Sequence, residues 1–314
     1  MKAVLLIGGF STQMRPLTLS HPLPLLEFCN QPLLMMQLQV LKDAGASQVI
    51  LCYYEKHVPH GWVEEIERME ADLGIRIICC KEEVAGGTAG AIKNAQAYIT
   101  DEGTSDAPFF VVNSDVLCTY PLRDLLHHHI KNGRECTLLC TRSNEPNAYG
   151  VVVADERTGR INHFVEKPET FVSDVINAGV YVFSPSMLSR IPADPHTSLN
   201  GVLKEMAREE QLQSMLLSGY WARAAAAPRP KRPVPRPHPL HRATRAPAAW
   251  QTKLVDKKSY MAGTAAHLEI MRFMSPASLT ASADGYTIKV RHCVWRRALP
   301  ASLRAPPLLR RHPT

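Results

Sequence analysis

The sequence predicts an α/β fold, in which a doubly wound and mostly parallel sheet carries helices on both faces, followed by a basic C-terminal extension. Short apolar runs alternate with segments of helical spacing through the first 220 residues, a pattern typical of strands joined by crossover helices. Apolar residues make up 45% of the chain, which is enough to build a core. The balance of charge changes sign near residue 221, and this change indicates a boundary there.

The elements follow from apolar spacing and from turn residues. An apolar run ended by two glycines predicts a strand at 2–7, and apolar residues three and four apart predict a helix at 32–44. Further strands are expected at 48–53, 76–80, 109–112, 136–140, 151–154, 161–166, 175–183 and 213–217, and further helices at 63–73, 89–98, 122–131 and 201–210. Ligands of such sheets bind beyond the carboxyl ends of the strands. The loops at 8–15, 82–90 and 113–116 are therefore candidates for the site.

The extension differs in composition from the rest of the chain. Residues 222–314 contain 18 Lys and Arg against 3 Asp and Glu, whereas residues 1–221 contain 18 against 26, so the net charge of +7 combines +15 with −8. Residues 222–249 hold nine Ala, seven Pro and six Arg and have no apolar periodicity. Proline at this density opposes both helices and central strands. We expect one folded domain at 1–221 and a largely disordered extension at 222–314, with one short helix near 265–274.

Several classes of protein are excluded by simple counts. No apolar stretch approaches the roughly 18 residues of a membrane-spanning helix. The apolar run at 3–7 is too short for a signal peptide, so it is interpreted as a buried strand and the protein as cytoplasmic. The eight cysteines show no zinc spacing and lie mostly in apolar runs, which predicts reduced, buried thiols. The basic extension contains no nucleic-acid-binding motif, so nucleic-acid binding is not favoured.

A glycine-containing loop follows the first strand. In the sequence Gly8-Gly9-Phe10-Ser11-Thr12 the glycines would let backbone N–H groups surround a phosphate, although a tight strand-to-helix turn would have the same composition. Four further motifs follow in order along the chain: Gly87-Thr88-Ala89-Gly90 after Glu82-Glu83, then Phe109 to Val116 with Asp115 near its end, then Tyr149-Gly150 with Phe164-Val165-Glu166-Lys167-Pro168, and then Ile176-Asn177-Ala178-Gly179.

These five motifs, in this order, resemble the sugar-1-phosphate nucleotidyltransferases, and most closely the mannose-1-phosphate guanylyltransferases, or GDP-mannose pyrophosphorylases. The resemblance covers residues 1–221 and implies a Rossmann-like nucleotidyltransferase fold that makes GDP-mannose and pyrophosphate from GTP and mannose 1-phosphate. It implies the following roles: Gly8, Gly9, Glu83, Gly87 and Thr88 bind the nucleotide, Gly150, Glu166, Asn177 and Gly179 bind the sugar, Arg15 and Lys167 are catalytic, and Asp115 holds Mg²⁺. No covalent intermediate is needed, because catalysis consists of positioning and charge neutralisation.

The sequence departs from this family at chemically important positions. Ser11, Gln13 and Leu23 stand where the family has Gly, Arg and Lys, and Arg223 stands where it has the second carboxylate that binds Mg²⁺. The loss of one well-placed electrostatic contact typically costs about 10² to 10³ in rate. We therefore expect impaired activity and doubtful occupancy of the metal site.

Two alternatives remain open at this point. A catalytically silent relative would bind a nucleotide sugar and act as the regulatory partner of a catalytic paralogue. The extension, in turn, lacks the β-helix repeats with which the family usually continues, and Ala, Pro and Arg have GC-rich codons, so residues 222–249 could be the product of a frameshift. The triplet His127-His128-His129 could bind a metal, but a solvated helix end is the favoured interpretation.

Overall fold

The computed structural model describes residues 1–7, 18, 21–28, 31–84, 86–100 and 106–223, together with three short strands at 281–282, 285–290 and 293–297. Its centre is a nine-stranded mixed sheet. The strands are β1 (Lys2–Leu6), β4 (Gln48–Tyr54), β5 (Arg76–Glu82), β6 (Phe109–Asn113), β8 (Cys136–Arg142), β9 (Gly150–Ala154), β10 (Ile161–Glu166), β11 (Val175–Phe183) and β12 (Leu212–Leu216). The helices are α1 (Leu33–Asp43), α2 (Trp62–Leu73), α3 (Thr88–Asn94), α4 (Gln96–Ile99), α5 (Leu122–Asn132) and α6 (Leu199–Arg208).

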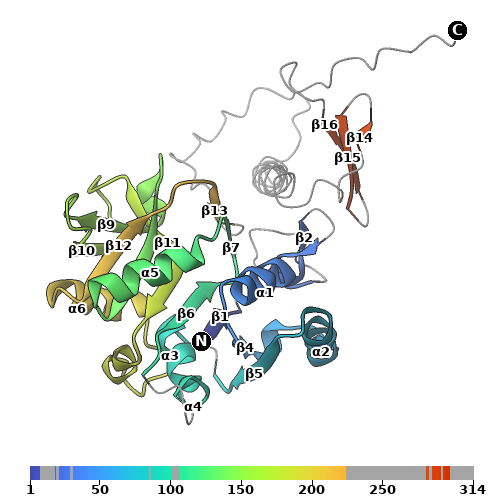
Figure 1. Ribbon diagram of the computed structural model, residues 1–314, viewed down its shortest axis with the longest axis horizontal. Helices are drawn as coiled ribbons and strands as arrows, with labels where there is room; N and C mark the ends of the chain where they lie inside the picture. The colour runs from blue at the N-terminus through green and yellow to red at the C-terminus, as the bar shows by residue number, and fades with distance from the viewer. Residues whose placement is uncertain are drawn as a thin grey trace, which may run out of the picture.

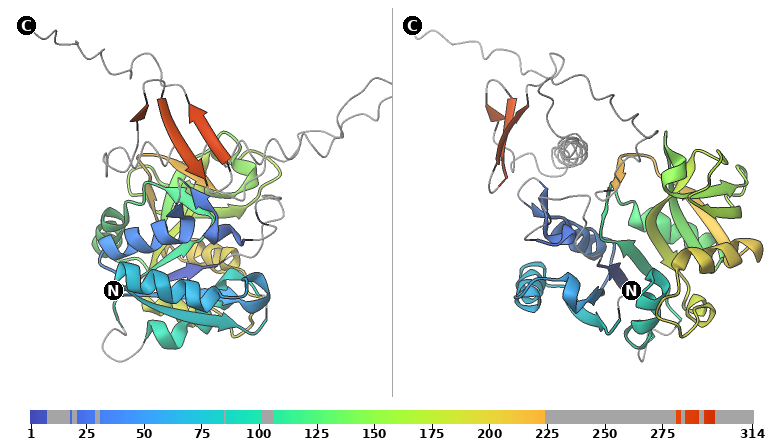
Figure 2. Two further views of the ribbon diagram at one scale, coloured as in Figure 1. Left: turned by 90° about the vertical axis from the view of Figure 1, so that its right-hand side faces the viewer. Right: turned by 180° about the vertical axis from the view of Figure 1, so that it is seen from behind.

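The sheet has a parallel half and a mostly antiparallel half, which lie side by side in Figure 1 and in the view from behind in Figure 2. Strands β5, β4, β1 and β6 are neighbours in that order and run parallel. The long strand β11 pairs antiparallel with β6, β8 and β9, and β12 joins β8 in parallel. The strand order places β1 in the interior of the sheet, between β4 and β6.

Both faces of the sheet are covered, as the sequence analysis predicts. Along β1, Ala3 and Leu5 point into one apolar cluster and Val4 and Leu6 into another. Helices α1, α2 and α5 supply the first cluster, whereas α3, α4 and α6 supply the second. Because successive side chains of a strand point to opposite faces, a continuous apolar run is the signature of a strand buried on both sides.

The predicted elements are confirmed, with small differences at their ends. The expected helix at 89–98 is two short helices, α3 and α4, which meet at Ala95. Sequence analysis does not predict the short strands β2 (Glu27–Phe28), β3 (Gln31–Pro32), β7 (Val116–Cys118) and β13 (Trp221–Arg223). Strand β13 pairs antiparallel with β7 and runs two residues past residue 221.

Little of the extension is described. It contains a three-stranded antiparallel sheet of β14 (Ala281–Ser282), β15 (Gly285–Val290) and β16 (Cys293–Arg297), which the sequence analysis does not predict. The expected helix near 265–274 lies outside the described residues. Six cysteines have described side chains, and all six are free thiols, as expected. In the described part of the chain, no helix is long and apolar enough to cross a bilayer.

Candidate functional site

Asp115 lies directly after β6, at the carboxyl end of the parallel strands. Its side chain is only 15% exposed, and its Oδ2 accepts a hydrogen bond of 2.6 Å from Nε of Arg223. Its other oxygen, Oδ1, is buried and has no hydrogen-bond partner among the described residues. One carboxylate oxygen of Asp115 is therefore hydrogen-bonded and the other is not. A buried carboxylate oxygen without a hydrogen-bond donor is energetically costly.

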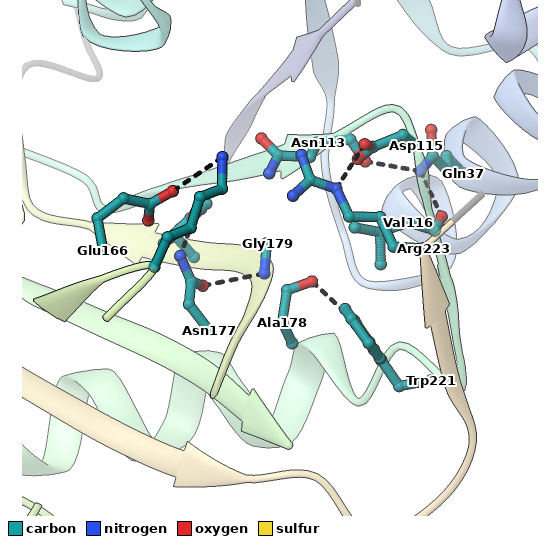
Figure 3. A network of polar contacts seen from close by, with 12 residues as sticks. Gln37, Asn113, Asp115, Val116, Glu166, Asn177, Ala178, Gly179, Trp221 and Arg223 are labelled. Atoms are coloured by element: carbon teal, nitrogen blue, oxygen red, sulfur yellow. Dashed lines mark hydrogen bonds and ion pairs between the residues drawn. The ribbon is translucent and has the colours of Figure 1, made fainter. Parts of the chain in front are cut away.

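Strand β13 brings Arg223 to this position. Arg223 is the register partner of Val116, the residue after Asp115. The strand is fixed by the indole of Trp221, whose Nε1 donates to the carbonyl of Ala178 at 2.9 Å and whose ring meets that of Tyr149 edge-on, with 5.4 Å between the centroids. Figure 3 shows the guanidinium of Arg223 beside Asn113 and Asp115, and Trp221 below it.

The electrostatics of the pair favour the charged arginine. Burial lowers the pKa of Arg223, but the charge and the hydrogen bond of Asp115 raise it, and the net shift is upward. The guanidinium therefore stays charged at every physiological pH. The Asp115 side chain is mostly buried, but 39% of the Arg223 side chain is exposed, so water weakens the pair relative to a fully buried one. Removal of Arg223 would still leave a mostly buried carboxylate without its charged partner.

The turn after β6 is fixed by a buried side chain that sequence analysis missed. Gln37, on α1, is fully buried, and its Nε2 donates to the carbonyls of Asn113 (3.1 Å) and Val116 (3.0 Å). The same nitrogen lies 3.1 Å from the hydroxyl of Tyr120. The one signal in the sequence that could have revealed this role is the presence of a glutamine among the apolar positions of the predicted helix at 32–44.

Asn177 and Gly179 form a bend in β11 beside Asn113. The N–H of Gly179 donates to Oδ1 of Asn177 at 3.0 Å, and Nδ2 of Asn177 donates to the hydroxyl of Tyr181 at 2.7 Å. Gly179 has φ +81°, and a Cβ at this position would lie 2.8 Å from Nδ2 of Asn113. Glycine is required here both for its backbone conformation and for the close approach. The amide of Asn177 is thus partly used within its own loop.

Glu166 and Lys167 end the hairpin of β9 and β10. Lys167 has φ +44°, which is uncommon for a residue other than glycine, and its N–H donates to the carbonyl of Tyr149 at 3.0 Å. Its Nζ lies 3.4 Å from Oε1 of Glu166, and both side chains are partly exposed. A strained backbone held by its surroundings is common at functional sites. Gly150 has a packing role here, because a Cβ on it would lie 2.7 Å from the ring of Phe164.

The glycine loop before α3 packs against a distant segment of the chain. The N–H of Gly87 donates to the carbonyl of Pro195 at 2.8 Å, and the hydroxyl of Thr88 accepts from the N–H of Leu199 at 3.2 Å. Gly87 and Thr88, which are predicted to contact the nucleotide, therefore also take part in hydrogen bonds within the protein. Glu83 is exposed at the start of the same loop.

The described residues bring Asp115, Gly150, Glu166, Lys167, Asn177 and Gly179 into one region, much of which Figure 3 shows. The predicted residues Gly8, Gly9 and Arg15, like Ser11 and Gln13, lie outside the described residues. Leu23, where the resemblance implies a lysine, is 3% exposed in an apolar cluster with Phe28, Leu33 and Leu117.

The residues around Asp115 do not fit a divalent metal ion. Magnesium prefers carboxylate oxygens together with water and phosphate oxygens, but here one carboxylate oxygen already accepts from a guanidinium. No group of three or more His, Cys, Asp or Glu is clustered among the residues that the structure describes. Arg223, which stands where the resemblance implies the second carboxylate, brings a positive charge to this position instead.

The histidine triplet has a structural explanation. His129 is 4% exposed, so the expectation of a fully solvated helix end is wrong for it. Its Nδ1 lies 3.0 Å from the hydroxyl of Thr137 and its Nε2 lies 3.1 Å from that of Ser184. His128 contacts the carbonyl of Ser214. The two rings thus connect α5 to strands of the sheet.

Comparison with known proteins agrees with the fold and shows the family. The model of the nucleotidyl transferase family matches residues 2–222, and the chain belongs to this family. It is 45% identical over 221 residues to the mannose-1-phosphate guanylyltransferase catalytic subunit beta of Danio rerio, and 43% identical to the mannose-1-phosphate guanyltransferase beta-A of Xenopus laevis. Each match covers 70% of this chain, and the chain spans 60% of the length of either relative.

Solved structures share the fold at low sequence identity. UDP-glucose pyrophosphorylase in complex with UDP-glucose superposes with a TM-score of 0.63 at 16% identity, covering 86% of this chain and 98% of that one. HddC from Yersinia pseudotuberculosis superposes with a TM-score of 0.57 at 19% identity, covering 71% and 93%.

Proposed function

We propose that this chain is a mannose-1-phosphate guanylyltransferase of strongly reduced activity, which uses GTP and mannose 1-phosphate. In this reaction a phosphate oxygen of the sugar phosphate attacks the α-phosphorus of GTP. The bond between that phosphorus and the oxygen bridging to the β-phosphate breaks, so that GDP-mannose forms and pyrophosphate leaves. The protein contributes position and positive charge and forms no bond of its own.

The observation that carries the proposal is the cluster at the carboxyl ends of the strands. Glu166, Lys167 and Asn177 lie near Asp115 in an arrangement that requires Gly179 and the unusual backbone of Lys167. Such a cluster at a strand end is the expected place for a ligand in an α/β sheet. The names of the two relatives supply the base and the sugar.

The roles of individual residues follow from their chemistry. Lys167 offers a point charge suited to the sugar phosphate, and Glu166 and Asn177 bond sugar hydroxyls next to Gly150 and Gly179. On the nucleotide side we assign Glu83, Gly87 and Thr88 to the base. Gly8, Gly9 and Arg15 are assigned to the phosphates of GTP.

A reduced rate follows from the departures. The resemblance implies cations at positions 13 and 23 that would neutralise the triphosphate, and Gln13 and Leu23 carry no charge. Arg223 stands where the same resemblance implies a carboxylate that binds the metal. Because Leu23 is buried among apolar residues, its side chain does not extend towards a ligand. Each loss of this kind costs about 10² to 10³ in rate, although such losses are not additive.

A second candidate function is favoured by the Asp115–Arg223 ion pair. If the pair prevents turnover altogether, the chain would bind nucleotide sugar and act as the regulatory partner of a catalytic paralogue. The pair occupies the carboxylate that a metal-dependent transfer would use. This function needs the sugar half of the site and leaves the triphosphate half unused.

Release of pyrophosphate from GTP and mannose 1-phosphate tests the two candidates. We expect slow turnover that Lys167→Ala abolishes and that Lys131→Ala, at an exposed position on α5, leaves unchanged. Binding of GDP-mannose without turnover would select the regulatory function. Absence of both turnover and binding would refute both candidates.

A further inference from the structure

We propose that the Asp115–Arg223 ion pair takes the place of a divalent metal ion, so that the site binds the diphosphate of a nucleotide sugar on the guanidinium and without added metal. The identity of this ligand rests on the proposed function. The replacement of the metal rests on the geometry of the pair alone.

The first step of the argument is that the pair is built into the fold. Arg223 comes from a strand whose register against β7 fixes it opposite Val116, and the hydrogen bond from Trp221 to Ala178 holds the strand. The two partners are 108 residues apart in sequence. The register therefore fixes the backbone of Arg223 opposite the residue that follows Asp115, and its side chain, which is 39% exposed, contacts the carboxylate.

The second step is that a metal and the guanidinium compete for the same carboxylate. Oδ2 of Asp115 accepts from Nε of Arg223 at 2.6 Å. A divalent ion at this carboxylate would lie within a few ångströms of the guanidinium, and two like charges at such a distance repel each other strongly in a partly buried site. Oδ1 of Asp115 has no donor among the described residues, but the guanidinium already balances the negative charge of the carboxylate, so the attraction of this oxygen for a divalent metal is weakened.

The third step concerns the rest of the guanidinium. Nε of Arg223 is used by Asp115, while the two terminal nitrogens make no hydrogen bond within the described part of the chain. Figure 3 shows them next to Asn113 at the end of β6, facing the region of Glu166 and Gly179. A guanidinium presents paired N–H groups that match two oxygens of a phosphate. The charge that a metal would supply to a diphosphate is therefore present in the protein.

The first experiment measures the metal alone. We would titrate the unmodified chain, Arg223→Asp and Arg223→Gln with Mn²⁺ and follow free Mn²⁺ by electron paramagnetic resonance. Arg223→Asp should bind at least about tenfold more tightly than the unmodified chain, because a cation is replaced by a second carboxylate. Arg142→Asp is the matched control, since Arg142 also contacts an aspartate, Asp174, at 2.6 Å but at an exposed position; it should gain no Mn²⁺ affinity.

The second experiment measures the ligand. Calorimetry with GDP-mannose should give the same affinity for the unmodified chain in excess chelator and in Mg²⁺, and an affinity lowered about 10- to 100-fold in Arg223→Gln, the value of a charged hydrogen bond. Arg223→Lys, which keeps the charge, should recover part of the loss. Thermal unfolding of each variant identifies any that fails to fold.

The two experiments test the ion-pair inference and the proposed function separately. Tight Mn²⁺ binding by the unmodified chain that disappears in Asp115→Asn would overturn the inference, and so would a folded Arg223→Asp that binds Mn²⁺ no better than the unmodified chain. GDP-mannose binding that requires a metal would also overturn it. If GDP-mannose binds to no variant under any condition, the proposed function is wrong, and the Mn²⁺ titration still decides whether the ion pair replaces the metal.

Discussion

The backbone of Gly87 lies against the carbonyl group of Thr197, so closely that a Cβ on Gly87 would be 2.1 Å from that oxygen. The contact joins the loop before α3 to the segment before α6. Further backbone hydrogen bonds from Gly87, Ala89 and Gly90 to residues 195 and 197 run alongside it. The loop that the sequence assigns to the nucleotide is therefore also a packing interface between two halves of the domain.

Gly87→Ala should destabilise the domain, because the oxygen that its Cβ meets belongs to backbone and cannot rotate away. We expect a loss of about 1 to 3 kcal/mol in the free energy of unfolding, the usual cost of overpacking. Urea unfolding followed by circular dichroism measures it. The control is Gly201→Ala on α6, where a Cβ meets nothing within 4 Å; there the substitution should stabilise the helix by up to about 1 kcal/mol. Equal effects of the two substitutions would contradict the packing role.

The stability of the domain should fall as the pH is lowered from 6.5 to about 4. Burial lowers the pKa of His129 to about 4, and the charge of neighbouring His128 adds to the effect. In this range the unfolded chain binds a proton at residue 129 and the folded chain does not, so acid favours unfolding. The contribution is on the order of 2 to 3 kcal/mol.

His129→Gln should flatten this dependence, because glutamine can bond the hydroxyls of Thr137 and Ser184 without titrating. Urea unfolding at pH 7 and pH 5 gives the difference. His127→Gln, at an exposed position on the same helix, should leave the slope unchanged. A slope that survives in His129→Gln would show that other groups cause it.

Leu23→Lys should destabilise the protein even though the resemblance implies a lysine at this position. Leu23 is packed with Phe28 and Leu117, and an ammonium group in that cluster would have no partner among its apolar neighbours. We expect a loss of about 2 to 4 kcal/mol, which combines the lost packing with the burial of a charge. Leu23→Met keeps the volume and should cost less than about 1.5 kcal/mol. Thermal unfolding compares the two, and an unchanged melting temperature in Leu23→Lys would mean that the segment can rearrange.

GDP-mannose should bind more tightly than GTP. According to the resemblance, the cations that are missing at positions 13 and 23 would face the β- and γ-phosphates of GTP, whereas GDP-mannose has no γ-phosphate. Lys167→Ala should weaken the binding of GDP-mannose by about 1.5 to 3 kcal/mol, the value of a hydrogen bond to a charged group. Calorimetry with both ligands measures this, and Lys131→Ala serves as the control. Equal affinities that do not depend on Lys167 would indicate that the sugar half of the site has lost its function too.

Local patterns in the sequence were sufficient to predict the longer strands and helices of the domain. The apolar run of β1, the helical spacing of α1 and the glycines around α3 each depend on residues close together in the chain, and all three predictions are confirmed. Elements without such a pattern were missed. Strand β13 has three residues and exists because β7 offers it a partner.

The sequence by itself determined which residues are available to the site, namely the carboxylate of Asp115, the lysine at 167, the glycine at 179 and the arginine at 223. Only the tertiary structure decided how they meet. The pairing of β13 with β7 brings Arg223 to Asp115, and the packing of α1 places Gln37 under the same turn. These contacts join residues about 80 to 110 positions apart, and no local pattern encodes them. They follow from strand order and register, which the whole core sets through burial of apolar surface.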